Sequence, residues 1–200
     1  MIEWINFIIL LVSLFIMCYL YTFSVQPVKR SKLKGEKAWK ECEQLRSIAG
    51  IFELISLINI LIWIWFPISI FNWKISDNYW IGIIIAFIIG VPCTLLMLKG
   101  IKDAGSETLK PSPDTKLYGG IYNYIRHPQT IGEFPLFIAV AFGINSWFLV
   151  IISLITIIIY IPIMIYYEEK DLVRRFGDKY KEYQARTGAI FPKMNLKKSQ

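Results

Sequence analysis

Long apolar runs separated by polar segments constrain the fold of this chain more than any other feature of its sequence. The runs cover about residues 5–25, 48–66, 79–98 and 147–167, with a shorter one at 129–142. A helix that spans a bilayer needs about 20 apolar residues, because its backbone polar groups must all be satisfied within the helix. The sequence therefore predicts an all-α integral membrane protein with five transmembrane helices.

Lysine and arginine collect between alternate runs, which predicts the orientation in the membrane. Segments 26–46, 99–128 and 168–200 hold 7, 5 and 9 of these residues, and Lys74 is the remaining one. Cytoplasmic loops carry the excess of positive charge, so the N-terminus is predicted outside and the C-terminus inside. Aromatic anchors at the opposite interface support this orientation. They are Trp4, Trp63, Trp65, Trp73, Trp80 and Trp147.

The length of 200 residues leaves room for one membrane domain. We expect it to cover 1–200, with three spans in 1–98 and a functional part in 99–200. The net charge of +7 indicates contact with anionic lipid headgroups and not with nucleic acid. The cysteines, Cys18, Cys42 and Cys93, lack metal-ligand spacing, so we expect free thiols and no metal site.

The functional part is predicted to contain a loop, a helical hairpin and an amphipathic tail. Segment 99–120 is polar, rich in glycine and proline, and long enough for a lid. A turn at 143–146 joins the two apolar limbs of the hairpin. The tail from Glu168 places apolar and basic residues on opposite helical faces, with a break at Gly177. It is expected on the cytoplasmic side.

The only histidine of the chain lies in the stretch Gly120-Ile121-Tyr122-Asn123-Tyr124-Ile125-Arg126-His127-Pro128. Residues at equal distances from the turn of an antiparallel hairpin lie side by side. The hairpin should therefore bring Arg126 and His127 close to Glu168 and Glu169 at the cytoplasmic surface. Such a cluster is either a structural salt bridge or the polar end of a cofactor site.

Several motifs in order carry a resemblance to a known superfamily. They are Gly120-x-Tyr122-x-x-x-Arg126-His127-Pro128, the hairpin, Glu168-Glu169, Phe176-Gly177-Asp178-x-Tyr180-x-x-Tyr183 and Phe191-Pro192. The region 103–192 resembles the membrane methyltransferases that include isoprenylcysteine carboxyl methyltransferases and phospholipid N-methyltransferases. This resemblance implies S-adenosylmethionine as methyl donor, bound without a metal. The implied cofactor contacts are Gly120, Tyr122, Arg126, His127, Pro128, Glu168 and Glu169, and Arg126 and Glu169 are also expected to act in catalysis.

The resemblance further implies a lipophilic acceptor that enters from the bilayer, as in the isoprenylcysteine group. Two departures bear on this expectation. Thr130 replaces a frequent tyrosine, and the turn before the Glu pair lacks the arginine that the isoprenylcysteine group tends to carry. A lipid amine and a small thiol therefore remain alternative acceptors. A non-catalytic scaffold or transporter subunit is the alternative from another class.

Two more carboxylates lie inside apolar runs, where charge is costly. Glu53 is expected to contact an acceptor, to pair with Arg46 or to extend to the interface. Glu133 opens the first limb of the hairpin and lies seven residues after Arg126. It is a candidate catalytic base for an acceptor that must first lose a proton.

Overall fold

The computed structural model describes residues 1–114, 117 and 119–193. Part of the predicted loop over 99–120, and the end of the predicted domain and tail, therefore lie outside the described residues. Within the described residues all regular elements are helical. Four helices are long and apolar enough to cross a membrane: α1 (Ile2–Ser24), α3 (Lys37–Ile62), α4 (Tyr79–Ala104) and α6 (Trp147–Phe176).

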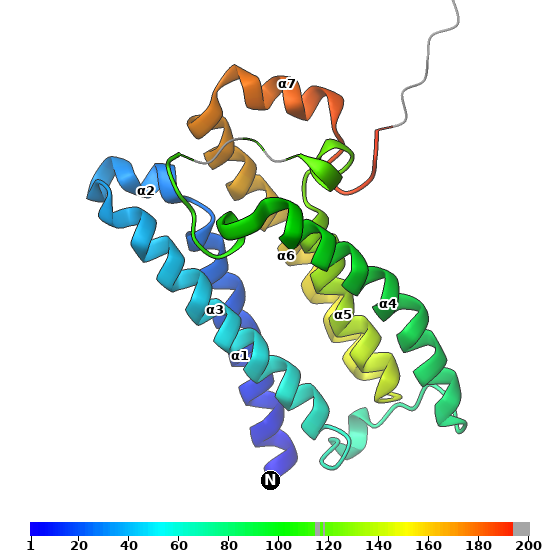
Figure 1. The fold of residues 1–200 in the computed structure, drawn as a ribbon. Helices are drawn as coiled ribbons and strands as arrows, with labels where there is room; N and C mark the ends of the chain where they lie inside the picture. Colours follow the sequence, from blue (N-terminus) through cyan, green and yellow to red (C-terminus); the bar gives the residue numbers. More distant parts are fainter. Residues whose placement is uncertain (115–116, 118, 194–200) are drawn as a thin grey trace, which may run out of the picture.

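The helices form two antiparallel pairs that α6 joins (Figure 1). The first pair is α1 with α3, and the second is α4 with α5 (Pro128–Gly143). Helix α5 has 16 residues, or about 24 Å at 1.5 Å per residue, which is shorter than a bilayer core. It coincides with the short predicted limb, so the count of five crossings remains a prediction.

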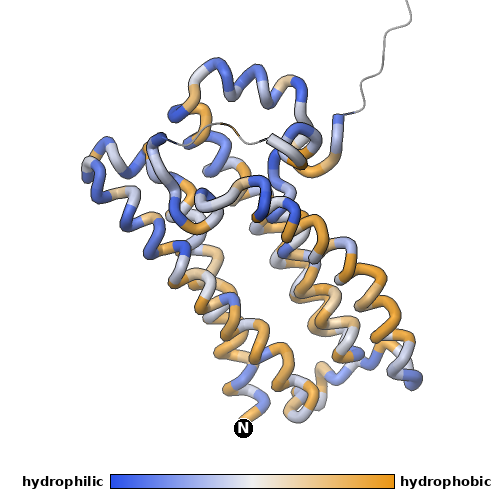
Figure 2. The backbone as a smooth tube through the Cα atoms, in the orientation of Figure 1, coloured by the Kyte–Doolittle hydropathy of each residue, from blue (hydrophilic) through white to orange (hydrophobic). Residues whose placement is uncertain are grey.

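Hydrophobic residues predominate along the long helices, as the colours of Figure 2 show for α4. Phe87, Ile88 and Leu95 of this helix are 63% to 67% exposed. Hydrophilic residues gather instead at the end of the bundle that holds α2 (Pro27–Lys34) and α7 (Asp178–Arg186) (Figure 2). This distribution is typical of helices whose outer faces contact lipid.

The basic segment 26–46, predicted as a loop, is largely helical and consists of α2 and the first turns of α3. Its charged residues are good helix formers, so polarity alone does not separate a loop from a helix that leaves the membrane. Asp171 of α6 holds the segment, because its carboxylate accepts the backbone N–H groups of Val28 and Lys29 at 2.9 and 2.7 Å. A carboxylate at the start of a helix satisfies otherwise unpaired N–H groups there.

Two other helices run further than predicted. Helix α4 extends to Ala104 and continues into a 3₁₀ turn at Gly105–Thr108, so the predicted loop starts later. Helix α6 does not end at Glu168 but continues to Phe176. The predicted break is confirmed, because Gly177 separates α6 from α7.

Aromatic residues pack at the end of the bundle opposite α2 and α7. Phe71 and Phe148 stack with their ring centroids 4.3 Å apart, and Trp63 stacks on Phe148 at 5.3 Å. Trp63 is only 2% exposed, so the prediction of an interfacial anchor is wrong for this residue. The sequence does not distinguish the two cases, because a tryptophan near a helix end can lie either at the membrane interface or in the protein core. The other five predicted anchors are exposed: Trp4, Trp65, Trp73, Trp80 and Trp147.

Helices α4 and α5 are in close backbone contact at Gly132. A Cβ atom on Gly132 would lie 2.4 Å from the backbone nitrogen of Met97 and 2.6 Å from the carbonyl oxygen of Cys93. The two backbones therefore pack directly against each other, as small residues allow in membrane proteins. This contact fixes the position of the N-terminal end of α5, where the candidate site lies.

Candidate active site

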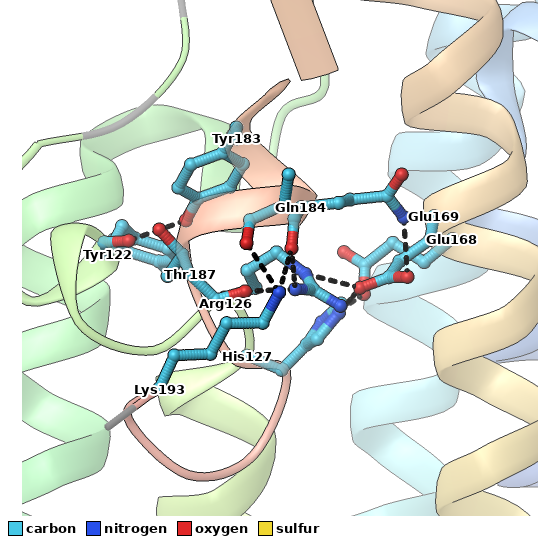
Figure 3. Close-up of polar contacts among 10 residues, drawn as sticks. Tyr122, Arg126, His127, Glu168, Glu169, Tyr183, Gln184, Thr187 and Lys193 are labelled. Atoms are coloured by element: carbon cyan, nitrogen blue, oxygen red, sulfur yellow. Dashed lines mark hydrogen bonds and ion pairs between the residues drawn. The ribbon is translucent and has the colours of Figure 1, made fainter. Parts of the chain in front are cut away.

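The predicted meeting of the Arg-His stretch with the Glu pair is confirmed by the geometry (Figure 3). Arg126 donates from Nε to Oε1 of Glu169 at 2.7 Å. His127 lies between the two acids, with Nδ1 3.0 Å from Glu168 Oε2 and Nε2 3.0 Å from Glu169 Oε1. The Glu pair lies on α6, and His127 precedes the first residue of α5. Antiparallel packing of these helices therefore assembles the cluster.

The segment that follows α7 holds the Arg-His stretch from the other side. The backbone N–H groups of Arg126 and His127 donate to the carbonyl oxygens of Gly188 and Ala189 at 2.9 and 3.1 Å. Arg126 Nη1 donates to the carbonyl oxygens of Gln184, at 3.2 Å, and Thr187. The side chain of Arg126 is thereby buried to 10% exposure with two of its three nitrogens occupied. Its position follows from contacts with two distant parts of the chain.

His127 is positively charged in this setting. Burial by itself lowers the pKa of the imidazole, but the hydrogen bonds and negative charges of Glu168 and Glu169 outweigh burial and raise the pKa to about 9. The cluster of Arg126, His127, Glu168 and Glu169 therefore contains two cations and two anions near neutral pH. Such a balance allows charged groups to be buried together.

The two carboxylates of the Glu pair differ in their surroundings. Glu169 accepts hydrogen bonds from Arg126, His127 and, at 2.8 Å, the side chain of Gln184. One carboxylate oxygen of Glu168, Oε2, contacts His127, and the Glu168 side chain is 29% exposed. It lines a cleft, whereas Glu169 lies behind the cleft wall. The arrangement leaves Glu168 free to contact a ligand.

The other predicted cofactor contacts shape the backbone or the cleft wall. Tyr122 lines the cleft, and its carbonyl oxygen accepts the Tyr183 hydroxyl at 2.6 Å. Gly120 has a φ of +61°, and a Cβ there would lie 2.1 Å from the carboxylate of Asp103. Pro128 is buried as the first residue of α5 and does not line the cleft. Gly120 and Pro128 therefore position the stretch, and neither residue lines the cleft.

The cleft beside the cluster has a volume of about 70 Å³. This is below the range of pockets for cofactor-sized molecules, about 300–1,000 Å³, so a ligand of that size requires the cleft to widen. The cleft is lined by cationic, anionic and aromatic side chains from α1, α3, α6 and α7 and from the segments between α4 and α5. The lining includes Tyr21, Arg46, Glu107, Thr108, Tyr122, Arg126, His127, Gln129, Glu168, Phe176, Tyr180 and Tyr183.

Sequence reasoning missed the contribution of the first and third helices to this cleft. Tyr21 comes from α1 and Arg46 from α3, and no local motif surrounds either residue. Pairing with Arg46 was one of the three alternatives for Glu53, but Arg46 donates to the carbonyl oxygens of Glu107 and Thr108 at 2.8 and 2.7 Å. Such contacts connect residues about 60 positions apart in the chain, and no periodicity in the sequence indicates them.

A second cleft of about 180 Å³ lies next to the first. Both clefts are lined by Tyr21, Arg46, Thr108 and Gln129, so they adjoin. Glu53 of α3 and Glu133 of α5 face each other in the second cleft and share a hydrogen bond. Glu133 is therefore apart from the Arg126 cluster, on the membrane side of Gln129. Among the described residues, no group of three or more His, Cys, Asp or Glu residues suits a metal ion.

Comparison with known sequences assigns the family. The profile of the phospholipid methyltransferases matches residues 77–179, which is more than half of the chain and includes the whole Arg126 cluster. The chain belongs to this family. It is therefore a membrane methyltransferase, and the alternative of a scaffold or transporter subunit is set aside.

Curated relatives of this family member carry one shared name. A methanethiol S-methyltransferase of Pseudomonas deceptionensis is 27% identical over 185 residues, which cover 86% of this chain and 70% of the relative. Methanethiol S-methyltransferase 1 of Bradyrhizobium diazoefficiens is 27% identical over 161 residues, which cover 74% of this chain and 54% of the relative. A methanethiol S-methyltransferase of Crocosphaera subtropica is 31% identical over 160 residues, with 74% and 60% covered. No solved structure matches the chain significantly.

Proposed function

We propose that this methyltransferase transfers a methyl group from S-adenosylmethionine to a small thiol. The observation that carries the proposal is the pair of adjoining clefts, one beside the Arg126 cluster and one with a carboxyl pair. The first suits a zwitterionic methyl donor and the second an acceptor that must lose a proton. The relatives named methanethiol S-methyltransferase support the choice of a thiol.

The residues of the first cleft fit the donor chemically. Its carboxylate suits the guanidinium groups of Arg46 and Arg126, because arginine presents several donors in a fixed plane. Within the described part of the chain, Arg46 pairs with carbonyl oxygens and forms no ion pair with a carboxylate, so its charge is available. The ammonium or ribose hydroxyls of the donor suit Glu168. The aromatic rings of Phe176 and Tyr180 suit an adenine ring.

When bound, the donor supplies a methyl group activated by a sulfonium cation. The chain then has to orient the acceptor and exclude water, which is catalysis by positioning. Glu169 is a positioning residue in this scheme, because it holds Arg126, His127 and Gln184 together behind the cleft wall. Arg126, besides facing the donor, also helps to position the cluster through Glu169 and the segment after α7.

We also propose that α5 crosses most of the bilayer and that the site faces the cytoplasm. The excess of lysine and arginine at the site's end of the bundle supports this orientation. The length of α5, 16 residues, supports a site whose mouth lies at or below the headgroups. A lipophilic acceptor then reaches the site from the bilayer and the polar donor reaches it from water.

A small thiol fits the chain better than an isoprenylcysteine carboxylate. The turn before Glu168 consists of Met164, Ile165, Tyr166 and Tyr167, so it offers no cation to a carboxylate acceptor. A carboxylate acceptor also needs no base, whereas the second cleft contains two carboxyl groups. The family profile, described as phospholipid methyltransferase, favours a lipid amine as the second candidate.

Thermal unfolding in detergent tests the donor site. S-adenosylmethionine at 100 times its Kd should stabilise the protein by about 2.7 kcal/mol. Glu168→Gln should weaken this stabilisation, while Glu182→Gln, an exposed acid on α7, should leave it unchanged. No stabilisation of the wild type would refute the proposal.

Methyl transfer from labelled donor tests the acceptor. Methanethiol should be methylated in detergent, whereas phosphatidylethanolamine and farnesylcysteine should not. Transfer to phosphatidylethanolamine alone would support the lipid-amine candidate and refute the thiol.

A further inference from the structure

The second cleft lies where a molecule from the bilayer can enter. Ala49, Gly50 and Glu53 of α3 form one side, and Met97 and Ile101 of α4 form the other. Helices α3 and α4 barely touch each other, so no tight helix packing closes the space between them. Gly50 and Ile101 are exposed on the outside of the bundle. The cleft therefore connects the lipid-facing surface with the donor cleft.

Two carboxyl groups share a hydrogen bond inside this cleft. Glu53 and Glu133 face each other from α3 and α5. Two carboxyl groups at hydrogen-bond distance in an apolar setting hold one proton between them, because both cannot be ionised so close together. The remaining charge sits on an oxygen that can accept another proton. The other titratable or charged groups in the lining are Tyr21 from α1, Arg46 from α3 and Tyr160 from α6.

Tyr160 supplies an independent sign of a ligand. Its side chain is 6% exposed and lines the second cleft. Its hydroxyl is buried with no hydrogen-bond partner among the described residues. A buried hydroxyl left unpaired costs free energy, which a polar atom in the cleft would recover.

We infer that the second cleft is the acceptor site, in which the Glu53–Glu133 pair takes the proton of a thiol and the Tyr160 hydroxyl donates to its sulfur. This inference rests on the proposed function. Apolar side chains of the lining, such as Met17 and Phe134, are suited to the alkyl part of the acceptor. The four residues shared by both clefts place the acceptor next to the donor.

Protons and electrons balance in the proposed methyl transfer to the thiol. The S–H bond breaks, its proton moves to a carboxylate oxygen of the pair, and its electron pair stays on the thiol sulfur. The resulting thiolate forms a bond to the methyl carbon, and the electron pair of the broken carbon–sulfonium bond stays with the sulfonium sulfur as a neutral thioether. The carboxyl pair later releases the extra proton to water. Tyr160 lowers the energy of the thiolate by donating its hydroxyl hydrogen.

The test compares Glu133→Gln, Glu53→Gln and Tyr160→Phe with the wild type. Glu43→Gln, which changes an exposed acid on the same helix as Glu53, is the matched control. Without its base, the enzyme should transfer methyl groups to methanethiol about 10²–10⁴-fold more slowly. The loss should appear in kcat and should shrink as rising pH converts free thiol to thiolate. Glu133→Asp should restore part of the rate, as a structural role alone would not.

A second readout needs no turnover. With S-adenosylhomocysteine in the donor cleft, bound methanethiol should show the ultraviolet absorption band of a thiolate in the wild type and in Glu43→Gln. The band should be weaker in Tyr160→Phe and absent in both Gln variants of the pair.

The outcomes separate the inference from the proposed function. If the wild type binds donor and methylates methanethiol, while both Gln variants keep its rate and pH profile, the inference is wrong and the proposed function stands. If the wild type shows no donor-induced stabilisation, both fail. A wild-type thiolate band that persists in the Gln variants also overturns the inference. Donor-induced stabilisation of each variant identifies those that remain folded.

Discussion

His127 should make the stability of the protein depend on pH in a defined window. Its imidazolium lies 3.0 Å from a carboxylate oxygen on each side and is 3% exposed. The raised pKa, about 9 against an ordinary 6.5, corresponds to about 3 kcal/mol at about 1.4 kcal/mol per unit. Replacing His127 with glutamine removes this contribution and leaves two carboxylates without the cation between them.

The sign of the dependence follows from the direction of the shift. A group whose pKa is raised in the folded state stabilises the fold fully below its unfolded pKa of 6.5, and this stability is lost as pH rises through about 9. The difference in unfolding free energy between wild type and His127→Gln should therefore be largest, about 3 kcal/mol, near pH 6 and should narrow toward pH 10.

Unfolding in detergent at a series of pH values measures this difference. The chain has one histidine, so no other imidazole contributes. Glu3→Gln, which removes the exposed ion pair of the amino terminus at 2.7 Å, is the control and should leave the dependence unchanged. A difference between wild type and His127→Gln that stays constant from pH 6 to about pH 10 would refute the charged-histidine reasoning.

Three further predictions concern the packing around the site. Arg126→Lys should lose donor affinity and about 1.5–3 kcal/mol of stability, because one ammonium group cannot bind Glu169 and the carbonyl oxygens together. Wild-type values for donor-induced stabilisation and for the unfolding free energy would contradict this prediction. Gly132→Ala should destabilise the protein by about 1–3 kcal/mol, whereas Gly90→Ala, whose added Cβ meets only the Ala139 Cβ at 3.6 Å, should be neutral in the same unfolding assay. Asp171→Ala should cost about 1–2 kcal/mol and raise hydrogen exchange at the start of α2; unchanged exchange there would show that Asp171 does not hold that helix.

The sequence was sufficient to predict the parts of the molecule that depend on local pattern and on hairpin symmetry. The apolar runs located the long helices, and approximate symmetry about the turn near residues 145–147 predicted that His127 lies close to the Glu pair. Both predictions depend on one strong constraint. A chain segment in lipid must satisfy its backbone hydrogen bonds internally, so each apolar run is expected to form a helix. They hold although α6 continues about two turns beyond the Glu pair.

The remaining part of the site depends on contacts that no local pattern encodes. Arg46 reaches the cleft through the carbonyl oxygens of Glu107 and Thr108, and Tyr160 looks like an ordinary core aromatic in sequence. Glu53 was given three alternatives, and its observed partner Glu133 lies on a helix 80 residues away. Such pairings follow from how helices pack in three dimensions, which periodicity along one helix does not specify.

The hydrogen bonds that connect the Arg-His stretch with residues 184–189 have a consequence for biosynthesis. Arg126 meets the carbonyl oxygens of Gln184 and Thr187 only 58 and 61 residues later in the chain. While the ribosome is still producing α6 and α7, a nascent chain already carries Arg126 without these acceptors at the membrane surface. The cleft beside the Arg126 cluster is therefore among the last parts of the enzyme to form, so truncated translation products would insert their helices yet stay inactive.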